Sequence, residues 1–176
     1  MIHIVLYQPE IPQNTGNIMR TCAATNSPLH LIKPYGFYLD EKHLRRSGMD
    51  YREDVDLHEY ESWEEFEAAN PGVKWLITRY GENTYSDVSF VCPYEEDLYL
   101  VFGKESTGID KEILKKDLEH CLRIPMVPEA RSLNLSNCVA LVLYEALRQN
   151  QFYDLSRYEV IKGREFLKNV QARPSL

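Results

Sequence analysis

The chain has 176 residues, a 44% hydrophobic composition and a formal net charge of −7. This length and composition predict one soluble globular domain, and the acidic charge argues against broad, non-specific binding of nucleic acid. The four cysteines show no CxxC spacing, which indicates reduced thiols. A strand-like run follows Met1 directly, and no apolar stretch reaches the roughly 18 residues of a membrane span. We therefore expect a cytoplasmic protein with no signal peptide and no membrane partner.

Short apolar runs alternate along the chain with stretches of helical periodicity. The runs predict strands at Ile2–Leu6, Leu29–Ile32, Val55–Leu57, Trp75–Thr78, Leu98–Phe102 and Cys121–Ile124. Helices are expected at Thr15–Thr25, from about Lys42, from the Ser62/Glu65 capping box to before Pro71, after Ile109, and from Leu135 to about Asn150. Several strands are apolar without interruption, so they predict a parallel sheet flanked by helices, an α/β fold. The core of this single domain is expected at about 1–150, and the tail 151–176 receives no role.

The helix expected from Leu135 is unusual because it is apolar nearly all round, from Cys138 to Leu147. A surface helix shows a single apolar stripe. This pattern predicts that the helix packs on its own sheet and also on a second subunit. The alternative is a deeply buried central helix in a monomer.

Several common ligand-binding motifs are missing from the sequence. No pair of glycines has the GxG spacing of a dinucleotide-binding loop, and no GxSxG nucleophile motif is present. The five histidines show no HExxH or other metal-binding spacing, so we expect no metal. These absences argue against a standard Rossmann enzyme, a serine hydrolase and a metalloenzyme.

Three loop-and-helix segments each follow a predicted strand: Pro9–Arg20, Phe102–Ile109 and Arg123–Asn137. The carboxyl ends of parallel strands are where open α/β sheets bind ligands. Taken singly, each segment is equally explained as a turn or a cap, with Asn134 or Ser136 as an ordinary helix N-cap. Two prolines stiffen the third segment, which a plain cap does not require. Together the three segments predict a ligand site.

The three segments resemble the motifs of the SPOUT (SpoU-TrmD) RNA methyltransferases, and most closely the small TrmL/YibK group of tRNA (cytidine/uridine-34)-2′-O-methyltransferases. The residues that carry the resemblance are Leu6–Arg20, Gly36-Phe37 with Leu44–Tyr51, Phe102–Gly108 and Arg123–Asn137. The resemblance implies a C-terminal trefoil knot, a homodimer, S-adenosyl-L-methionine as cofactor, and methylation of the ribose 2′-OH of wobble nucleotide 34 in tRNA anticodon loops. Methylation of another tRNA or rRNA site and a catalytically silent RNA-binding dimer are the alternatives.

The resemblance also assigns site residues. The cofactor pocket is expected to contain Ile77, Thr78, Gly103, Ile124, Met126, Ser132 and Leu133. Arg20, Ser132 and Asn134 are the catalytic candidates, with Arg20 acting across the dimer or within one chain. Because arginine is a poor base, we expect Arg20 to orient a phosphate or to stabilise charge on the ribose oxygen. Glu129 is a rival base.

In this acidic chain, one basic cluster precedes the middle of the sequence. The residues expected to contact RNA are Arg20, Lys42, Arg45, Arg46 and Arg131. The alternative for these cations is a solvated helix face. Single-stranded RNA loops also require stacking on aromatic rings, and Tyr35 and Phe37 flank the cluster.

Overall fold

The computed structural model describes residues 1–37, 54–91, 93 and 96–169. Within these ranges the chain forms a seven-stranded sheet in the order β3-β2-β1-β6-β4-β7-β5, and all its pairs are parallel. The strands are β1 (Ile2–Tyr7), β2 (Leu29–Ile32), β3 (Leu57–Tyr60), β4 (Val73–Ile77), β5 (Asn83–Thr84), β6 (Leu98–Phe102) and β7 (Cys121–Arg123). The predicted α/β fold with a parallel sheet is confirmed.

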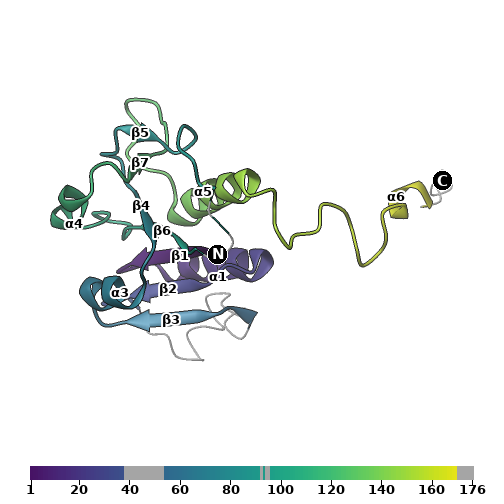
Figure 1. The fold of residues 1–176 in the computed structure, drawn as a ribbon, viewed down its shortest axis with the longest axis horizontal. Helices are drawn as coiled ribbons and strands as arrows, with labels where there is room; N and C mark the ends of the chain where they lie inside the picture. Colours follow the sequence, from purple (N-terminus) through teal and green to yellow (C-terminus); the bar gives the residue numbers. More distant parts are fainter. Residues whose placement is uncertain (38–53, 92, 94–95, 170–176) are drawn as a thin grey trace, which may run out of the picture.

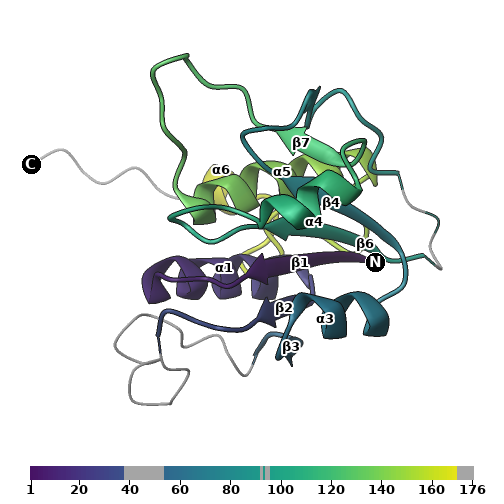
Figure 2. The ribbon, with the colours of Figure 1, turned by 90° about the vertical axis from the view of Figure 1, so that its left-hand side faces the viewer.

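Helices cover both faces of the sheet (Figures 1 and 2). They are α1 (Pro12–Thr25), α3 (Trp63–Ala69), α4 (Lys111–Lys116), α5 (Leu135–Gln149) and α6 (Phe166–Asn169). Side chains alternate along a strand. Ile4 and Leu6 of β1 therefore belong to the core under α1 and α5, and Val5 and Tyr7 belong to the core under α3 and α4.

The strands that were predicted from uninterrupted apolar runs agree best with the structure. β2 and β6 have the predicted bounds. The prediction of a strand at Val55–Leu57 is wrong, because the strand begins at Leu57 and continues through two exposed polar residues to Tyr60. An edge strand has one neighbour and tolerates such residues, so its apolar pattern is weak. The helix expected from Lys42 lies outside the described residues.

Two helix starts bear on the predictions. Ser62 caps α3 by accepting a hydrogen bond from the Glu65 backbone at 3.2 Å, as predicted, but the Glu65 carboxylate accepts from the backbone of Glu61 at 2.7 Å. Helix α1 begins at Pro12, three residues before the expected start, with the proline in its first turn. Arg20 is therefore the ninth residue of α1, more than two turns from its start.

A wide loop joins β7 to α5 and stands away from the sheet (Figure 2). The trefoil knot expected in this region stays a prediction. No helix in the described ranges is long and apolar enough to cross a membrane.

Candidate functional site

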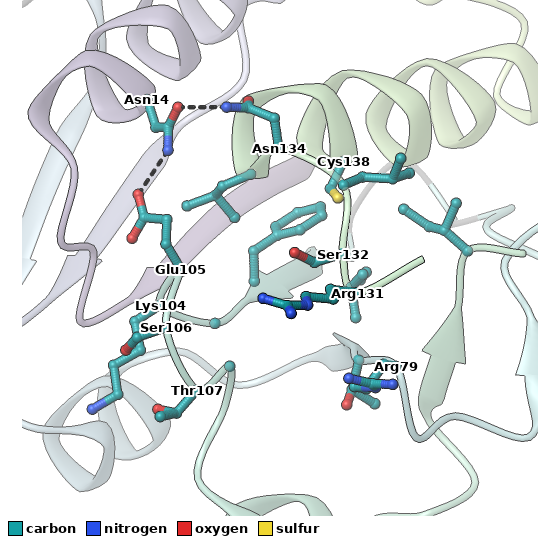
Figure 3. A pocket seen from close by; sticks show the side chains of 18 of the residues that line it. Asn14, Arg79, Lys104, Glu105, Ser106, Thr107, Arg131, Ser132, Asn134 and Cys138 are labelled. Atoms are coloured by element: carbon teal, nitrogen blue, oxygen red, sulfur yellow. Dashed lines mark hydrogen bonds between the residues drawn. The ribbon is translucent and has the colours of Figure 1, made fainter. Parts of the chain in front are cut away.

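A cleft of about 900 Å³ lies at the carboxyl ends of three neighbouring strands, β6, β4 and β7. Loops that follow these strands form most of its wall, and the start of α1 and the start of α5 close it (Figure 3). The three segments singled out in the sequence therefore meet at one place, because parallel strands bring their carboxyl ends to the same edge of the sheet.

All seven residues expected at the cofactor pocket line this cleft. They are Ile77, Thr78, Gly103, Ile124, Met126, Ser132 and Leu133. Ile77 ends β4 and Thr78 follows it, Gly103 follows β6, and the other four belong to the connection from β7 to α5. The cleft thus has an apolar side made of aliphatic residues and a polar side made of loop residues.

Gly103 has a structural role beside any contact with a ligand. A Cβ atom at this position would lie 2.2 Å from the backbone of Gly108 and of Ile109. The loop is closed there by a hydrogen bond from the Gly108 backbone to the Lys104 carbonyl at 2.9 Å. Only glycine permits this approach of two backbone segments.

Two glutamates join the first and second loops by exchanging hydrogen bonds. Glu105 accepts from the backbone of Glu10 at 2.8 Å and of Ile11 at 3.2 Å. In return, Glu10 accepts from the backbone and the hydroxyl of Ser106 at 2.9 and 2.8 Å. Carboxylates that accept several donors in this way fix the distance between the two loops. Sequence reasoning did not find this pair, because its members are 95 residues apart.

Asn14 extends the connection to the third loop (Figure 3). Its side-chain nitrogen donates to Glu105 at 2.9 Å, and its oxygen accepts from the Asn134 side-chain nitrogen at 3.0 Å. The Asn134 oxygen caps α5 by accepting from the backbone of Ser136 at 3.0 Å and of Asn137 at 3.4 Å. Asn134 is therefore the N-cap that the sequence allowed, and it also positions the cleft wall.

The cleft is basic although the chain is acidic. Among the residues that the structure describes, four cationic side chains line it, Arg79, Lys104, Lys111 and Arg131, against one carboxylate, Glu105. Four positive charges and one negative charge give this lining a net charge of +3, whereas the whole chain carries −7. Only Arg131 was predicted, because the other three come from segments with no basic pattern. Clustered cations in a concave site attract an anionic ligand such as a nucleic-acid backbone.

Ser132 and Arg131 lie at the cleft with side chains that make no hydrogen bond or ion pair to another described residue. Both are exposed. They are therefore available to a bound molecule. The Cys138 thiol also faces the cleft, and burial raises its pKa, which keeps it protonated and neutral.

The structure does not bring Arg20 to the cleft of its own chain. Arg20 is exposed on α1, with Ile18 and Met19 buried beside it, and it is absent from the described residues that line the cleft. Arg20 lies more than two turns into α1, whereas only the start of this helix borders the cleft. Three other predicted RNA contacts, Lys42, Arg45 and Arg46, lie outside the described residues.

Comparison with known proteins identifies the family. The model of the SpoU rRNA Methylase family matches residues 1–144, and these include the three loops of the cleft. The chain belongs to the SpoU rRNA methylase family. The predicted resemblance to SPOUT methyltransferases is confirmed.

Two curated relatives of this SpoU-family chain match almost their whole length. One from Methylovorus glucosotrophus, named tRNA (cytidine(34)-2′-O)-methyltransferase, is 48% identical over 154 residues, which are 86% of this chain and 97% of the relative. One from Geobacillus stearothermophilus, provisionally given the same name, is 51% identical over 156 residues, which are 88% of this chain and 99% of the relative.

Solved structures of RNA methyltransferases are also similar to this chain. A provisionally named RNA methyltransferase from Bacillus anthracis is 47% identical, with a TM-score of 0.85 over 91% of this chain and all of that one. A structure concerned with the 2-OH methylation of C/U34 on tRNA is 43% identical, with a TM-score of 0.77 over 86% of this chain and 97% of that one. The AdoMet-bound SpoU methyltransferase AviRb from Streptomyces viridochromogenes is 23% identical, with a TM-score of 0.67 over 86% of this chain and 58% of that one, and shares the fold.

Proposed function

We propose that this protein transfers a methyl group from S-adenosyl-L-methionine to the ribose 2′-OH of nucleotide 34, a cytidine or modified uridine, in tRNA anticodon loops. The observation that carries the proposal is the basic cleft built from three family motifs, in a chain that is about half identical to cytidine-34 methyltransferases over nearly their full length. The reaction would take place in the cytoplasm, where tRNA is found.

The cleft fits the proposed cofactor by its chemistry. An adenosyl group needs an apolar slot with backbone polar groups beside it, and a charged amino-acid end needs polar partners. Ile77, Ile124 and Leu133 supply aliphatic surface, while Thr78 and Ser132 add hydroxyl groups. We assign these residues, with Gly103 and Met126, to the cofactor.

When bound, S-adenosylmethionine supplies an electrophilic methyl group: an oxygen–carbon bond to the ribose forms, the carbon–sulfur bond breaks, and the 2′-OH proton must leave. The chain's contribution is alignment, because such a displacement requires the reacting atoms in line. The side chains of Ser132 and Arg131 have no hydrogen-bond or ion-pair partner among the described residues, so they can hold the ribose and a neighbouring phosphate.

The proton needs an acceptor. Glu105 is the one carboxylate among the described residues that line the cleft, and three donors already bind its two oxygens. Glu129, the rival base, does not line the described cleft. We therefore assign proton removal to an RNA phosphate or a water molecule, with Asn134 positioning the loop that holds Ser132.

A homodimer would bring Arg20 to a cleft. Helices α1 and α5 lie side by side on one face of the sheet. The outer side of α5 exposes Leu141 by 44% and Tyr144 by 48%, and Arg20 lies on the exposed side of α1. Exposed apolar side chains of this size on a surface helix are typical of an interface. We propose that this face is the dimer interface and that Arg20 serves the cleft of the other subunit.

The test incubates the purified protein with methyl-labelled S-adenosylmethionine and total bacterial tRNA, followed by nucleoside mapping. We expect 2′-O-methylated cytidine or uridine at position 34. The Arg131→Ala variant should lose most of the label, whereas Lys116→Ala, which removes an exposed cation outside the cleft, should not. Label only at tRNA positions other than 34, or no transfer with intact cofactor binding, would overturn the proposal.

A further inference from the structure

The chain leaves the globular body a few residues after α5. Asn150 ends this helix, and the next residues turn sharply, with positive φ angles at Gln151, Phe152 and Asp154. Phe152 and Leu155 still pack against the core. Residues 156–169 then extend away from the body (Figure 1), and we call this segment the arm.

The arm carries apolar side chains that the other described residues of its chain leave exposed. Ile161 is 95% exposed and Leu167 is 83% exposed, and Val160 is exposed beside them. Isolated exposed apolar residues are ordinary, but several in one short extended segment indicate a binding surface. The family model ends at residue 144, so the arm lies beyond the part of the chain that the cleft requires.

The arm also differs in charge from the body. The arm contains four basic and two acidic residues, a net charge of +2, whereas the whole chain carries −7. Three of the basic groups lie over aromatic rings, for example Lys162 over Phe166 at 4.8 Å. The arm is therefore complementary in charge to the body of this protein.

A second cavity, of about 280 Å³, lies where the last turns of α1 and α5 meet the start of β1. Its lining includes the apolar residues Ile2 and Leu147 and the exposed residues Asn26 and Asp154. The carboxyl ends of two long helices and the Asp154 carboxylate favour a cation at its rim. Since a cavity of roughly 150 Å³ accepts benzene, this one has room for a branched side chain and its neighbour.

We propose that the arm of one chain docks into this second cavity of another copy, with Val160 and Ile161 on the apolar floor and Lys162 toward Asp154. The way in which the arm leaves the body favours docking into another copy over docking into the cavity of its own chain. Arg157 donates to the Gln151 carbonyl at 2.8 Å and lies 5.4 Å from the Phe152 ring, which fixes the first residues of the arm on the preceding turn. From there the arm runs away from the body of its own chain (Figure 1). Exchange of an identical element is a low-cost route to a dimer.

RNA is the other ligand that a basic, aromatic segment suggests. The two acidic residues of the arm, Glu159 and Glu165, reduce its attraction for phosphates, and RNA offers nothing to the aliphatic pair Val160 and Ile161. A protein surface with an apolar floor and an acidic rim matches both the aliphatic pair and the basic side chains of the arm. A second copy of this chain presents such a surface.

The proposal rests on the proposed dimer to bring the two copies together, and the test uses single cysteines in separate chains. An Ile161→Cys chain carrying a size tag is mixed with an untagged Asn26→Cys chain and mildly oxidised. A mixed-size disulfide product can arise only between copies. Leu118→Cys, at a 67% exposed leucine outside the second cavity, replaces Asn26→Cys as the control, and wild type reports any native cysteine pairing.

We expect a mixed-size product with Asn26→Cys and none with Leu118→Cys. Ile161→Asp should weaken dimerisation about tenfold or more in sedimentation equilibrium, because an apolar side chain leaves its pocket. An intrachain disulfide in the Asn26→Cys/Ile161→Cys double variant without a mixed product would overturn the exchange. So would an Ile161→Asp variant that dimerises normally but binds tRNA less tightly, which would make the arm an RNA contact. Methyl transfer is measured separately, so failure here leaves the proposed reaction standing.

Discussion

Asn14 and Asn134 lie 120 residues apart in the sequence, and a hydrogen bond of 3.0 Å joins their side-chain amides. The other end of the Asn14 amide donates to Glu105 at 2.9 Å, so one buried residue fixes the relative positions of all three loops of the cleft. An amide is required because Asn14 must accept from one partner and donate to the other.

Asn14→Asp should therefore disrupt the cleft. The new carboxylate would face Glu105 with no proton to donate, and we expect a loss of about 1–3 kcal/mol in the free energy of unfolding, together with weaker binding of S-adenosylmethionine. Urea unfolding and titration calorimetry measure the two effects. Asn17→Asp, an exposed change on the same helix, is the matched control. Equal stability of the two variants would contradict the positioning role.

Leu133→Asp tests the proposed cofactor slot. Leu133 is partly exposed and lines the cleft, so the substitution should leave the fold intact. Loss of an apolar contact should weaken S-adenosylmethionine binding by roughly 10- to 100-fold in calorimetry. Leu118→Asp, outside the cleft, should bind normally. Gly103→Val is a poor test, because its side chain would strike the backbone of its own loop.

Arg20→Ala tests the role of Arg20 in the reaction. Because Arg20 is exposed and outside the cleft of its own chain, the melting temperature and cofactor affinity should stay close to wild type. Methyl transfer to tRNA should fall by about 100-fold or more, as for loss of one donor at a reacting oxygen. Arg20→Lys should recover little, since a point charge does not reproduce a bidentate contact. Unfolding of Arg20→Ala with normal transfer by the folded fraction would make Arg20 structural.

Substitutions in α5 test the proposed dimer. Tyr144→Glu places a charge on the proposed interface and should shift the wild-type dimer toward monomer in sedimentation experiments, with the melting behaviour of the monomer retained. Val142→Asp is the contrasting variant. Val142 has no exposed surface within one chain, so a charge there should cost several kcal/mol of folding stability. A wild-type protein that is monomeric at micromolar concentration would refute the dimer.

The lowered pKa of the buried His30 predicts that the protein is less stable in acid. Burial lowers its pKa to about 3, and His30 lies 2.9 Å from His3 and 3.0 Å from the Tyr60 hydroxyl. A histidine in the unfolded chain has a pKa of about 6.5, so only the unfolded chain gains this proton as the pH falls from about 6.5 toward 3.

The free energy of unfolding should therefore be fully retained above about pH 6.5 and fall below it, by up to about 1.4 kcal/mol per pH unit for this one group. Burial also lowers the pKa of His3, which adds to the same slope. Urea unfolding between pH 7 and 4.5 measures it. His30→Gln keeps hydrogen-bonding groups without the titration and should show a smaller slope. Identical slopes in both proteins would exclude His30 as the source.

The sequence by itself predicted the central strands of the sheet and the edge of the sheet at which the candidate site lies. Apolar runs at Leu29–Ile32 and Leu98–Phe102 are local signals for buried parallel strands, and both strands have the predicted bounds. Parallel strands bring their carboxyl ends together, so the three polar loops had to meet at one edge of the sheet. Local patterns also predicted the Ser62 cap and gave Asn134 and Ser136 as the two candidate caps of α5, of which the structure has Asn134.

Only the tertiary structure decided how the site is held together and which groups face it. The Glu10, Asn14, Glu105 and Asn134 network joins segments far apart in the chain, and no local pattern encodes such pairs. The four cationic side chains of the cleft come together for the same reason. The order of the strands decides which loops, and therefore which cations, meet at the cleft. The apolar α5 pattern did not show that Val142 faces its own sheet while Tyr144 faces outward, because the direction of a side chain depends on the surface against which its helix packs.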